Sequence, residues 1–346
     1  MRRYKRISEG KSVKQNILFV SGLPDNRQIK VVSAHLDGQV RYKYSGTCDF
    51  YNYMSPPDWN KKHIMLDHQT IPVALSKGTH YIFNQISEAD THQNALARLQ
   101  QICAAHPQIP VFNRPEHVAL TRRDLLYHRL KDIKNLIVPQ TLRFHPQNPQ
   151  DIHDAIQKEN MHYPVILKEA GAHNARQVIR IDTPDKLNTL HAFAFDGRPY
   201  YLIQYKDTAQ QGVYTKHRLV MVRGQFYPRH LCATNHWLVN YKRSNAFMTE
   251  HPAYYAQESH FVEHFHEALA SQLNPIAQDI YKRIPIDFVG LDCCLLPDGQ
   301  LMIFEMNANM TLLTNSPPKA NRLAAIVKIK EAVYEAVQQD FKEVSV

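Results

Sequence analysis

Three oxygen-bearing side chains near the carboxyl end of the sequence have the types and spacing of a divalent-metal site. Asp292 lies in the apolar segment 286–296, and Glu305 and Asn307 lie two residues apart at the end of the next apolar segment. The intervening Pro297-Asp298-Gly299 predicts a tight turn and therefore a β-hairpin. Because side chains two apart on a strand point to the same face, Glu305 and Asn307 should project together, with Asp292 nearly opposite.

Two carboxylates and an amide are hard oxygen ligands, which suit Mg²⁺ and do not suit zinc. Most neighbouring residues on both segments are apolar, so we expect the hairpin to pack against a core. Carboxylates left there without a cation or a hydrogen-bond donor would be costly. The residues alone leave a second interpretation open, in which the acids are solvated on the open face of an ordinary hairpin.

Basic and amide side chains recur upstream, at the ends of other predicted elements. Lys168 ends the apolar segment 164–168, and the loop after it, Glu-Ala-Gly-Ala-His, contains a glycine that allows the backbone to approach a ligand closely. Arg123 lies at the start of a predicted helix, next to Arg122. Polar residues at the ends of two further predicted strands are Gln204 and Arg218.

Taken in order, these segments resemble the ATP-grasp superfamily over about residues 115–320. The branches that they resemble are the ribosomal-protein glutamate ligases and the D-alanine:D-alanine ligases. In that superfamily an acid on one strand and a Glu-x-Asn pair on the next hold two Mg²⁺ ions between the nucleotide phosphates. The resemblance implies this role for Asp292, Glu305 and Asn307, with Mn²⁺ as a substitute metal.

The resemblance also implies which residues contact the phosphates of ATP. Lys168 matches the family's ATP lysine. Gly171 and His173 lie in the loop that folds over the phosphates, which here has one glycine where many relatives have two or three. Arg123 lies where relatives carry a first phosphate-binding basic residue, usually a lysine, and the adjacent Arg122 is the alternative.

The segment from residue 201 onwards resembles the hinge between the two halves of the family's ATP site. The backbone of that hinge pairs with adenine, and a Glu or Gln side chain takes the amino group. This implies adenine contacts for Gln204 and Tyr205. The acid that usually holds the ribose is not recognisable, and its candidates are Asp207 and Gln211.

Two further matches concern the reacting phosphoryl group. Arg218 matches an arginine that faces the transferred phosphoryl group, although the acid that usually stands two residues before it is absent. Arg218 and Lys168 are therefore the implied catalytic residues. The segment Trp237-Leu-Val-Asn240 resembles an aromatic-x-x-Asn motif near the phosphates, which implies Asn240 as one more contact.

The sequence before these motifs has the pattern of a small α/β domain. Strands are predicted over 17–20, 29–36, 80–86 and 111–112, with a helix over about 90–105. This alternation favours a mostly parallel sheet. We therefore expect an α/β (α+β) chain whose small α/β domain, residues 1–115, precedes the two α+β subdomains that the resemblance implies, which grip ATP and span residues 116–200 and 201–346.

Capping and periodicity predict the helices of the two later segments. Thr121 should cap a helix over 122–133, and Asp151 and Thr183 should open two more. A four-residue apolar spacing predicts a helix over 258–273, after which Pro275 should open another that ends near residue 283. The segment 323–337 is expected to be a closing amphipathic helix.

Composition excludes several classes of protein. Hydrophobic residues make up 44% and charged residues 21% of the 346 residues, which is typical of globular and not of disordered proteins. No apolar run reaches the roughly 18 to 20 residues that span a bilayer, so we expect no membrane contact. Five cysteines without CxxC spacing fit free thiols and a cytoplasmic location. The net charge of +9 favours acidic partners such as a nucleotide, and no nucleic-acid partner is expected.

The resemblance implies an ATP-dependent carboxylate-amine or carboxylate-thiol ligase that works through an acylphosphate, forms an amide or peptide bond and releases ADP and phosphate. Its partners would be a small-molecule or peptide substrate with a carboxylate and an amine acceptor; homo-oligomerisation is left open. Two alternatives are a kinase that phosphorylates a hydroxyl and a nucleotide-binding regulator without catalysis. Asp292→Asn or Glu305→Gln is expected to lower turnover by orders of magnitude without unfolding the protein.

Overall fold

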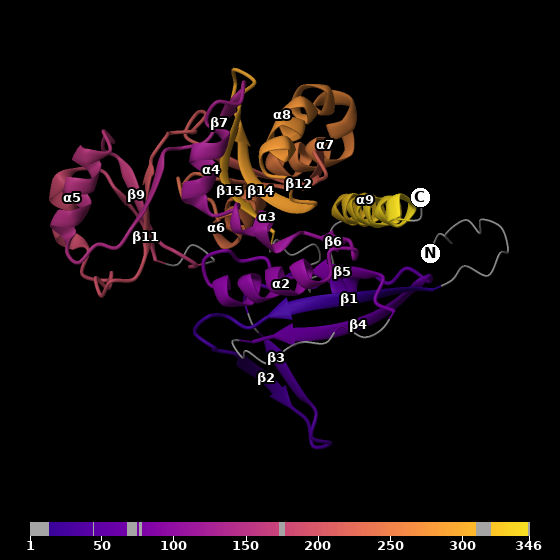
Figure 1. The fold of residues 1–346 in the computed structure, drawn as a ribbon. Helices are drawn as coiled ribbons and strands as arrows, with labels where there is room; N and C mark the ends of the chain where they lie inside the picture. Colours follow the sequence, from indigo (N-terminus) through magenta and orange to yellow (C-terminus); the bar gives the residue numbers. More distant parts are fainter. Residues whose placement is uncertain are drawn as a thin grey trace.

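The computed structural model describes residues 14–43, 45–67, 75, 78–172, 177–308 and 320–344 (Figure 1). It is a mixed α/β structure whose described strands form three larger sheets and one two-stranded ribbon. The three sheets follow one another along the chain, except that one short early strand joins the last sheet. The expected α/β (α+β) fold class is confirmed.

The first sheet is parallel throughout, as predicted. Its central strand is a continuous apolar run that is buried on both faces, which is the pattern of a parallel strand covered on both sides. In spatial order the sheet contains β4 (Trp59–Leu66), β1 (Gln15–Gly22), β5 (Tyr81–Asn84) and β6 (Val111–Phe112). The helices of this part are α1 (Phe50–Tyr53) and α2 (Gln93–Ala105).

The strand predicted over 29–36 is present but does not join this sheet. It is shorter, as β2 (Lys30–Ala34), and it pairs only with β3 (Val40–Lys43), in a ribbon that extends away from the domain (Figure 1). The strand that pairs with β1 on that side is β4, which the sequence analysis does not predict. The apolar signal of β4 is weak because only its two end residues, Trp59 and Leu66, are buried.

The second sheet is antiparallel and carries its own helix. Helix α5 (Pro149–Lys158) begins two residues before the predicted start because Asn148 and Asp151 form a capping box. The helix expected after Thr183 is a 3₁₀ helix (Pro184–Thr189). In spatial order the strands are β10 (Val178–Ile181), β9 (Val165–Glu169), β11 (Tyr200–Gln204) and β8 (Thr141–Phe144).

The third sheet contains the predicted hairpin of β14 (Phe288–Leu295) and β15 (Leu301–Asn307). The other strands are β13 (Gln225–Thr234), β12 (Tyr214–Val222) and β7 (Leu136–Ile137), in the order β13-β12-β14-β15-β7. The helices around it are α3 (Pro115–Ala119), α4 (Arg123–Leu130), α6 (Tyr241–Glu250), α7 (Ala253–Ala268), α8 (Ala270–Arg283) and α9 (Ala320–Val344). Figure 1 shows α7 and α8 together beside this sheet, with α9 between the sheet and the first domain.

Two residues that are predicted to start helices, Pro275 and Thr121, do not do so in the structure. The break between α7 and α8 falls at Leu269, and Pro275 lies inside α8. Proline removes one backbone hydrogen bond there, but the apolar face of α8, which includes the fully buried Leu273 and Ile280, packs into the core and outweighs that loss. Thr121 does not cap α4; its hydroxyl donates to the carbonyl of Val118 at 2.8 Å.

Three hydrophobic cores hold these parts together. One joins the first sheet to α4 and the third sheet, and a second, rich in phenylalanine, joins the first sheet to the third sheet and α9. In the second core the rings of Phe50 and Phe288 meet edge to face, with centroids 4.8 Å apart. The third core lies wholly within the second sheet and its helix.

The strands of each sheet indicate where the boundaries between the expected subdomains lie. The expected boundary after residue 200 falls inside β11, and β7 belongs to the third sheet although it lies within the expected segment 116–200. We therefore propose that the first subdomain ends at Gln204 and begins after β7. Among the described residues, no helix combines the length and apolar character needed to cross a membrane.

Candidate active site

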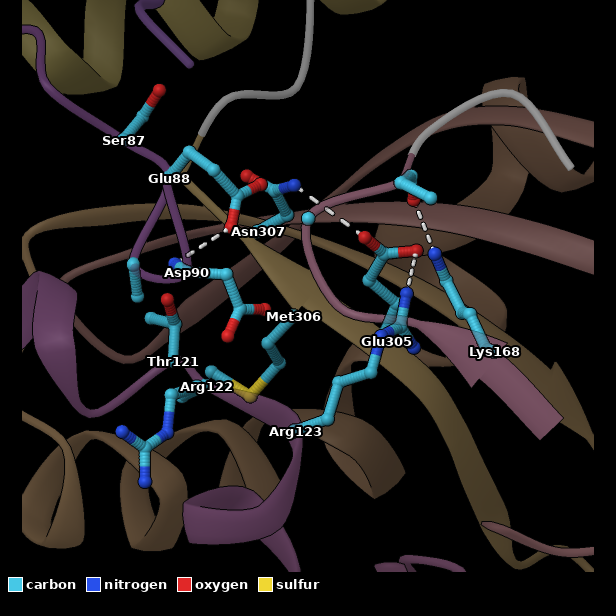
Figure 2. Close-up of a pocket in the computed structure, with 13 residues that line it drawn as sticks. Ser87, Glu88, Asp90, Thr121, Arg122, Arg123, Lys168, Glu305, Met306 and Asn307 are labelled. Carbon is cyan, nitrogen blue, oxygen red and sulfur yellow. Dashed lines mark hydrogen bonds and ion pairs between the residues drawn. The ribbon is translucent and has the colours of Figure 1, made fainter. Parts of the chain in front are cut away.

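One pocket is lined by all three parts of the chain (Figure 2). Its walls come from the segment that follows β5, the start of α4, the end of β9 with the turn after it, and the end of β15. The lining residues are Ser87, Glu88, Ala89, Asp90, Thr121, Arg122, Arg123, Lys168, Gly171, Ala172, Glu305, Met306 and Asn307. Five of the predicted ATP or metal ligands are therefore brought together here: Arg123, Lys168, Gly171, Glu305 and Asn307. Asp292 and Arg218 are not among the lining residues.

The predicted geometry of the hairpin is confirmed. Glu305 and Asn307 share a face, since the Asn307 amide donates to a Glu305 carboxylate oxygen at 3.4 Å. Asp292 is the direct cross-strand partner of Glu305. The three oxygen-bearing side chains thus belong to two adjoining strands. The pairing next to the turn, in which Cys293 lies opposite Ile303, would by itself place Asp292 opposite Phe304. A β-bulge follows Asp292 and shifts the register of the rest of the hairpin.

Asp292 does not line the pocket, because two cations on β12 hold its carboxylate. Arg218 donates to one oxygen at 2.7 Å and Lys216 to the other at 2.8 Å. Burial opposes the negative charge, but these two cations outweigh it and hold the pKa of Asp292 well below its usual range. Asp292 is therefore ionised at neutral pH and paired with Arg218. Arg218 is a predicted phosphate ligand, and it too is not among the residues that line the pocket.

Arg123 fixes the other carboxylate. One nitrogen of its guanidinium donates to the carbonyl of Phe304 at 2.7 Å and another contacts Glu305 at 2.5 Å. Burial opposes ionisation of Glu305, but Arg123 and Lys168 outweigh it and hold its pKa at about 2. Arg122, the alternative to Arg123, pairs instead with Asp124 through two bonds of 2.8 Å.

Lys168 is the last residue but one of β9, and its ammonium group donates to the carbonyl of Ala172 (Figure 2). Burial lowers the pKa of Lys168 to about 8, and the nearby Arg123 adds to the effect. The turn between them needs glycine: Gly171 has φ +74°, and a Cβ there would lie 2.4 Å from Cγ2 of Thr91. His173, the other residue predicted in this loop, lies outside the described residues.

The space between the described lining residues is small. The cavity measures about 20 Å³, which corresponds to roughly one water molecule. A triphosphate is larger than this cavity.

The sequence matches no protein-family model and no curated protein. Solved structures do resemble the fold. D-alanyl-alanine synthetase A from Vibrio cholerae has a TM-score of 0.53 and 13% identity, over 94% of this chain and 98% of that one. The VanG D-Ala:D-Ser ligase from Enterococcus faecalis has a TM-score of 0.53 and 13% identity, over 90% of this chain and 95% of that one. The D-alanine-D-alanine ligase from Coxiella burnetii has a TM-score of 0.51 and 10% identity, over 95% of this chain and 98% of that one.

The chain has the ATP-grasp fold. We propose that its second and third sheets correspond to the two subdomains that the sequence analysis expects, and the first sheet to the preceding domain. At 10–13% identity this resemblance concerns the fold. The roles of individual residues therefore remain predictions, to be judged by where the structure places them.

Within the ATP-grasp fold, the predicted adenine and ribose residues lie away from this pocket. The side-chain amide of Gln204 donates to the carbonyl of His162 at 2.9 Å and accepts from its backbone N–H at 3.0 Å. Tyr205 packs against Trp237. Asp207 is exposed and accepts from the N–H of Ala209. In this structure these side chains therefore bind their own chain.

Asn240 has a local structural role. It is the N-cap of α6, and its side chain accepts from the backbone N–H of Arg243 at 3.0 Å. The aromatic residue of the same motif, Trp237, stacks on His236 and meets Tyr205 edge to face. The motif thus begins a helix that the sequence analysis does not predict.

The sequence analysis misses the four lining residues that follow β5, Ser87 to Asp90. Glu88 accepts from the backbone N–H of Asp90 at 3.1 Å, and Asp90 accepts from the Tyr201 hydroxyl at 2.8 Å. Burial raises the pKa of Asp90, and Glu88 adds to the increase. A signal was present, because ligands bind at the carboxyl ends of parallel strands and these polar residues directly follow a predicted one.

Proposed function

We propose that this ATP-grasp protein is an ATP-dependent ligase that activates a substrate carboxylate as an acylphosphate and transfers the acyl group to an amine or a thiol. The observation that supports this most is the single pocket in which Arg123 and Lys168 face Glu305 and Asn307. Two cations and two oxygen ligands in one cavity suit a phosphate chain with its metal. The solved structures that share the fold include D-alanine ligases, which adds support.

The donor set fits Mg²⁺. Glu305 and Asn307 lie on one face, Asp292 is the direct partner of Glu305, and both carboxylates are held ionised, as metal ligands must be. We propose that these three residues hold two Mg²⁺ ions, or Mn²⁺ in their place. The metal would neutralise charge on the phosphates and on the transferred group. The described residues contain no group of three or more His, Cys, Asp or Glu side chains that could hold a metal ion. In our proposal the third oxygen ligand is the amide of Asn307.

The chain's own cations act on the reacting phosphate. Lys168, at the end of a rigid strand, would exchange the carbonyl of Ala172 for a phosphate oxygen. Arg123 is already fixed at two points, and it would present its guanidinium to the phosphates at little cost in entropy. Arg218 would stabilise charge on the transferred phosphoryl group from the side of Asp292.

A product assay tests the reaction class. Purified protein with Mg-ATP is incubated with pairs of carboxylic acids and amines, including amino acids and short peptides, and phosphate release and product mass are recorded. The ligase predicts ADP and phosphate only when acid and amine are both present, with a product lighter by one water than the sum of the two. A stable phosphoester would show a kinase, and tight ATP binding without turnover would show a regulator.

A variant tests the site itself. Glu305→Gln keeps the shape and a hydrogen-bond acceptor for Arg123 but removes the charge that a metal needs, so we expect turnover to fall at least 100-fold with a small change in melting temperature. Glu331→Gln removes an exposed charge from α9 and serves as the control. Full activity of the Glu305 variant at low Mg²⁺ would contradict the proposed metal site.

A further inference from the structure

The β2–β3 ribbon carries an unusual amount of exposed apolar surface. Of ten large hydrophobic residues that are exposed in the described structure, six lie between residues 29 and 42. Val31 is 55% exposed, Val40 38% and Tyr42 54%. A two-stranded hairpin is marginally stable alone in water, and contiguous exposed apolar surface marks an interaction site.

The register gathers these residues on one face. Val31 is paired with Tyr42 and Ala34 with Val40, and paired residues on neighbouring strands share a face. Val31 and Ala34 are three residues apart, so in a regular strand their side chains would lie on opposite faces. The irregularity in pairing between Val31 and Ser33 places them on the same face. One face of the ribbon is therefore apolar along its length. No strand of the described chain pairs with the outer edge of β2 or of β3, so both edges offer backbone groups.

The ribbon is anchored at the candidate active site. Before β2, the backbone N–H of Asp25 donates to the carbonyl of Thr91 at 2.7 Å. After β3, the carbonyl of Gly46 accepts from the backbone N–H of Ser87 at 2.9 Å and from its hydroxyl at 3.0 Å. Ser87 lines the pocket, and Thr91 touches the Gly171 loop that closes it. The base of the ribbon therefore lies next to the pocket, and a strand bound along the ribbon would have one end directed toward it.

We propose that the β2–β3 ribbon docks an extended acidic segment of a polypeptide substrate by strand addition; this rests on the proposed ligase function and assigns its substrate to peptides or proteins. Residues 27–43 contain four basic residues and one acidic residue, a net charge of +3. An acidic strand with alternating apolar residues would match the charge, the apolar face and the free edges together.

The same observations argue against other occupants. A second copy of the chain would bring an identical ribbon of charge +3 against the first. Nucleic acid would match the charge, but it would leave the apolar face of Val31, Val40 and Tyr42 without apolar partners. Strand addition of an acidic polypeptide satisfies both features.

Peptide binding without ATP tests this proposal separately from turnover. Fluorescence anisotropy compares a labelled ten-residue peptide of alternating Glu and Val with one of alternating Lys and Val and with a single-stranded oligonucleotide of equal negative charge. We expect the acidic peptide to bind at least tenfold more tightly than either, and its affinity to fall as salt rises. Equal affinity for the basic peptide, or tighter binding of the oligonucleotide, would overturn the proposal.

Ribbon variants locate the binding. Val31→Ser, Val40→Ser and Tyr42→Ser combined should weaken the acidic peptide at least tenfold, while Tyr241→Ser, an equally exposed aromatic on α6, should change it less than twofold. The ribbon lies outside the three cores, so the melting temperature should not change. Unchanged affinity in the triple variant, or a dimer in light scattering that this variant dissociates, would overturn the proposal. Phosphate release with free amino acids is measured in parallel. Failure of the ribbon proposal would appear in the binding assay, and failure of the proposed ligase function would appear in the phosphate assay.

Discussion

Asp292 and Glu305 lie directly opposite each other on β14 and β15, yet each carboxylate is neutralised from a different element. Asp292 pairs with Arg218 and Lys216 of β12, and Glu305 pairs with Arg123 of α4. Two neighbouring acids can remain ionised in a buried place because each has its own cation. The pair therefore has a structural role as well as the proposed metal-binding role.

Removal of the charge of Asp292 should cost stability as well as activity. Asp292→Asn leaves two cations around a nearly buried position, for which about 3 kcal/mol of destabilisation is expected. The folded-state pKa of Asp292 is below its unfolded value, so its contribution is present above the ordinary aspartate pKa of about 4 and is lost as the pH falls further. Thermal melting should show a deficit at pH 7 that shrinks below pH 4. Asp298→Asn, at the exposed tip of the same hairpin, should show none, and a normal melting temperature for Asp292→Asn would contradict the stabilising role.

The pKa of Lys168 predicts an alkaline limit to ATP use. Because burial lowers this pKa to about 8, the free enzyme loses the ammonium charge above that pH. We expect kcat/KM for ATP to fall as the pH rises through 8, and Lys168→Arg to move that limit above pH 9, since arginine stays charged. Lys206→Arg, on an exposed residue, is the control. The same alkaline limit in wild type and Lys168→Arg would exclude Lys168 as its source.

Replacement of Arg123 should expose the acid titration of Glu305. Arg123→Lys loses one of the two bonds that the guanidinium makes, so the pKa of Glu305 should rise from about 2 toward the ordinary glutamate value of about 4.3 or above. Activity should then decline below pH 6 in this variant and not in wild type. Arg122→Lys is a matched control, because Arg122 pairs with Asp124. Identical acid profiles for the two variants would show that Arg123 does not control Glu305.

Gly171 should tolerate no side chain. In Gly171→Ala the new Cβ would meet Thr91 at 2.4 Å, in addition to about 1–2 kcal/mol for the left-handed backbone. We expect kcat/KM for ATP to fall about tenfold or more. Thr91→Ser removes the clashing methyl group and should restore part of the loss. Gly212→Ala has the same backbone strain in open space, and its kcat/KM should stay near wild type; an equal loss there would assign the effect to strain alone.

Local signals in the sequence were sufficient to predict the hairpin and its site. The turn at Pro297-Asp298-Gly299 and the spacing of Glu305 and Asn307 are properties of one short segment, and they predict the hairpin and the shared face of those two residues. The β-bulge that brings Asp292 opposite Glu305 has no such local signal. The parallel first sheet followed from alternating strand and helix patterns in the same way. The ATP-grasp fold followed from the order of several weak motifs.

Contacts between distant segments could not be predicted in this way. The pairing of Arg123 with Glu305 joins residues 182 positions apart, and nothing local distinguishes Arg123 from Arg122. Asn240 was assigned to a phosphate motif, although asparagine before a run of polar residues is also a helix cap, and it caps α6 in the structure. The sequence predicts a helix start at Pro275 because the packing of α8, which tolerates a proline inside the helix, is not visible in it.

The distribution of the cores determines which part of the molecule can move. Two cores fasten the amino-terminal domain, the third sheet and α9 into one block, whereas the third core is confined to residues 142–202. Two chain segments connect that smaller piece to the block, and the hydrogen bond from Tyr201 to Asp90 and the contact of Gly171 with Thr91 link them beside the pocket. We therefore expect a nucleotide to be admitted by a hinge motion. In this motion residues 141–204 would move away from the block as one body, and the strand pairing within each sheet would not change.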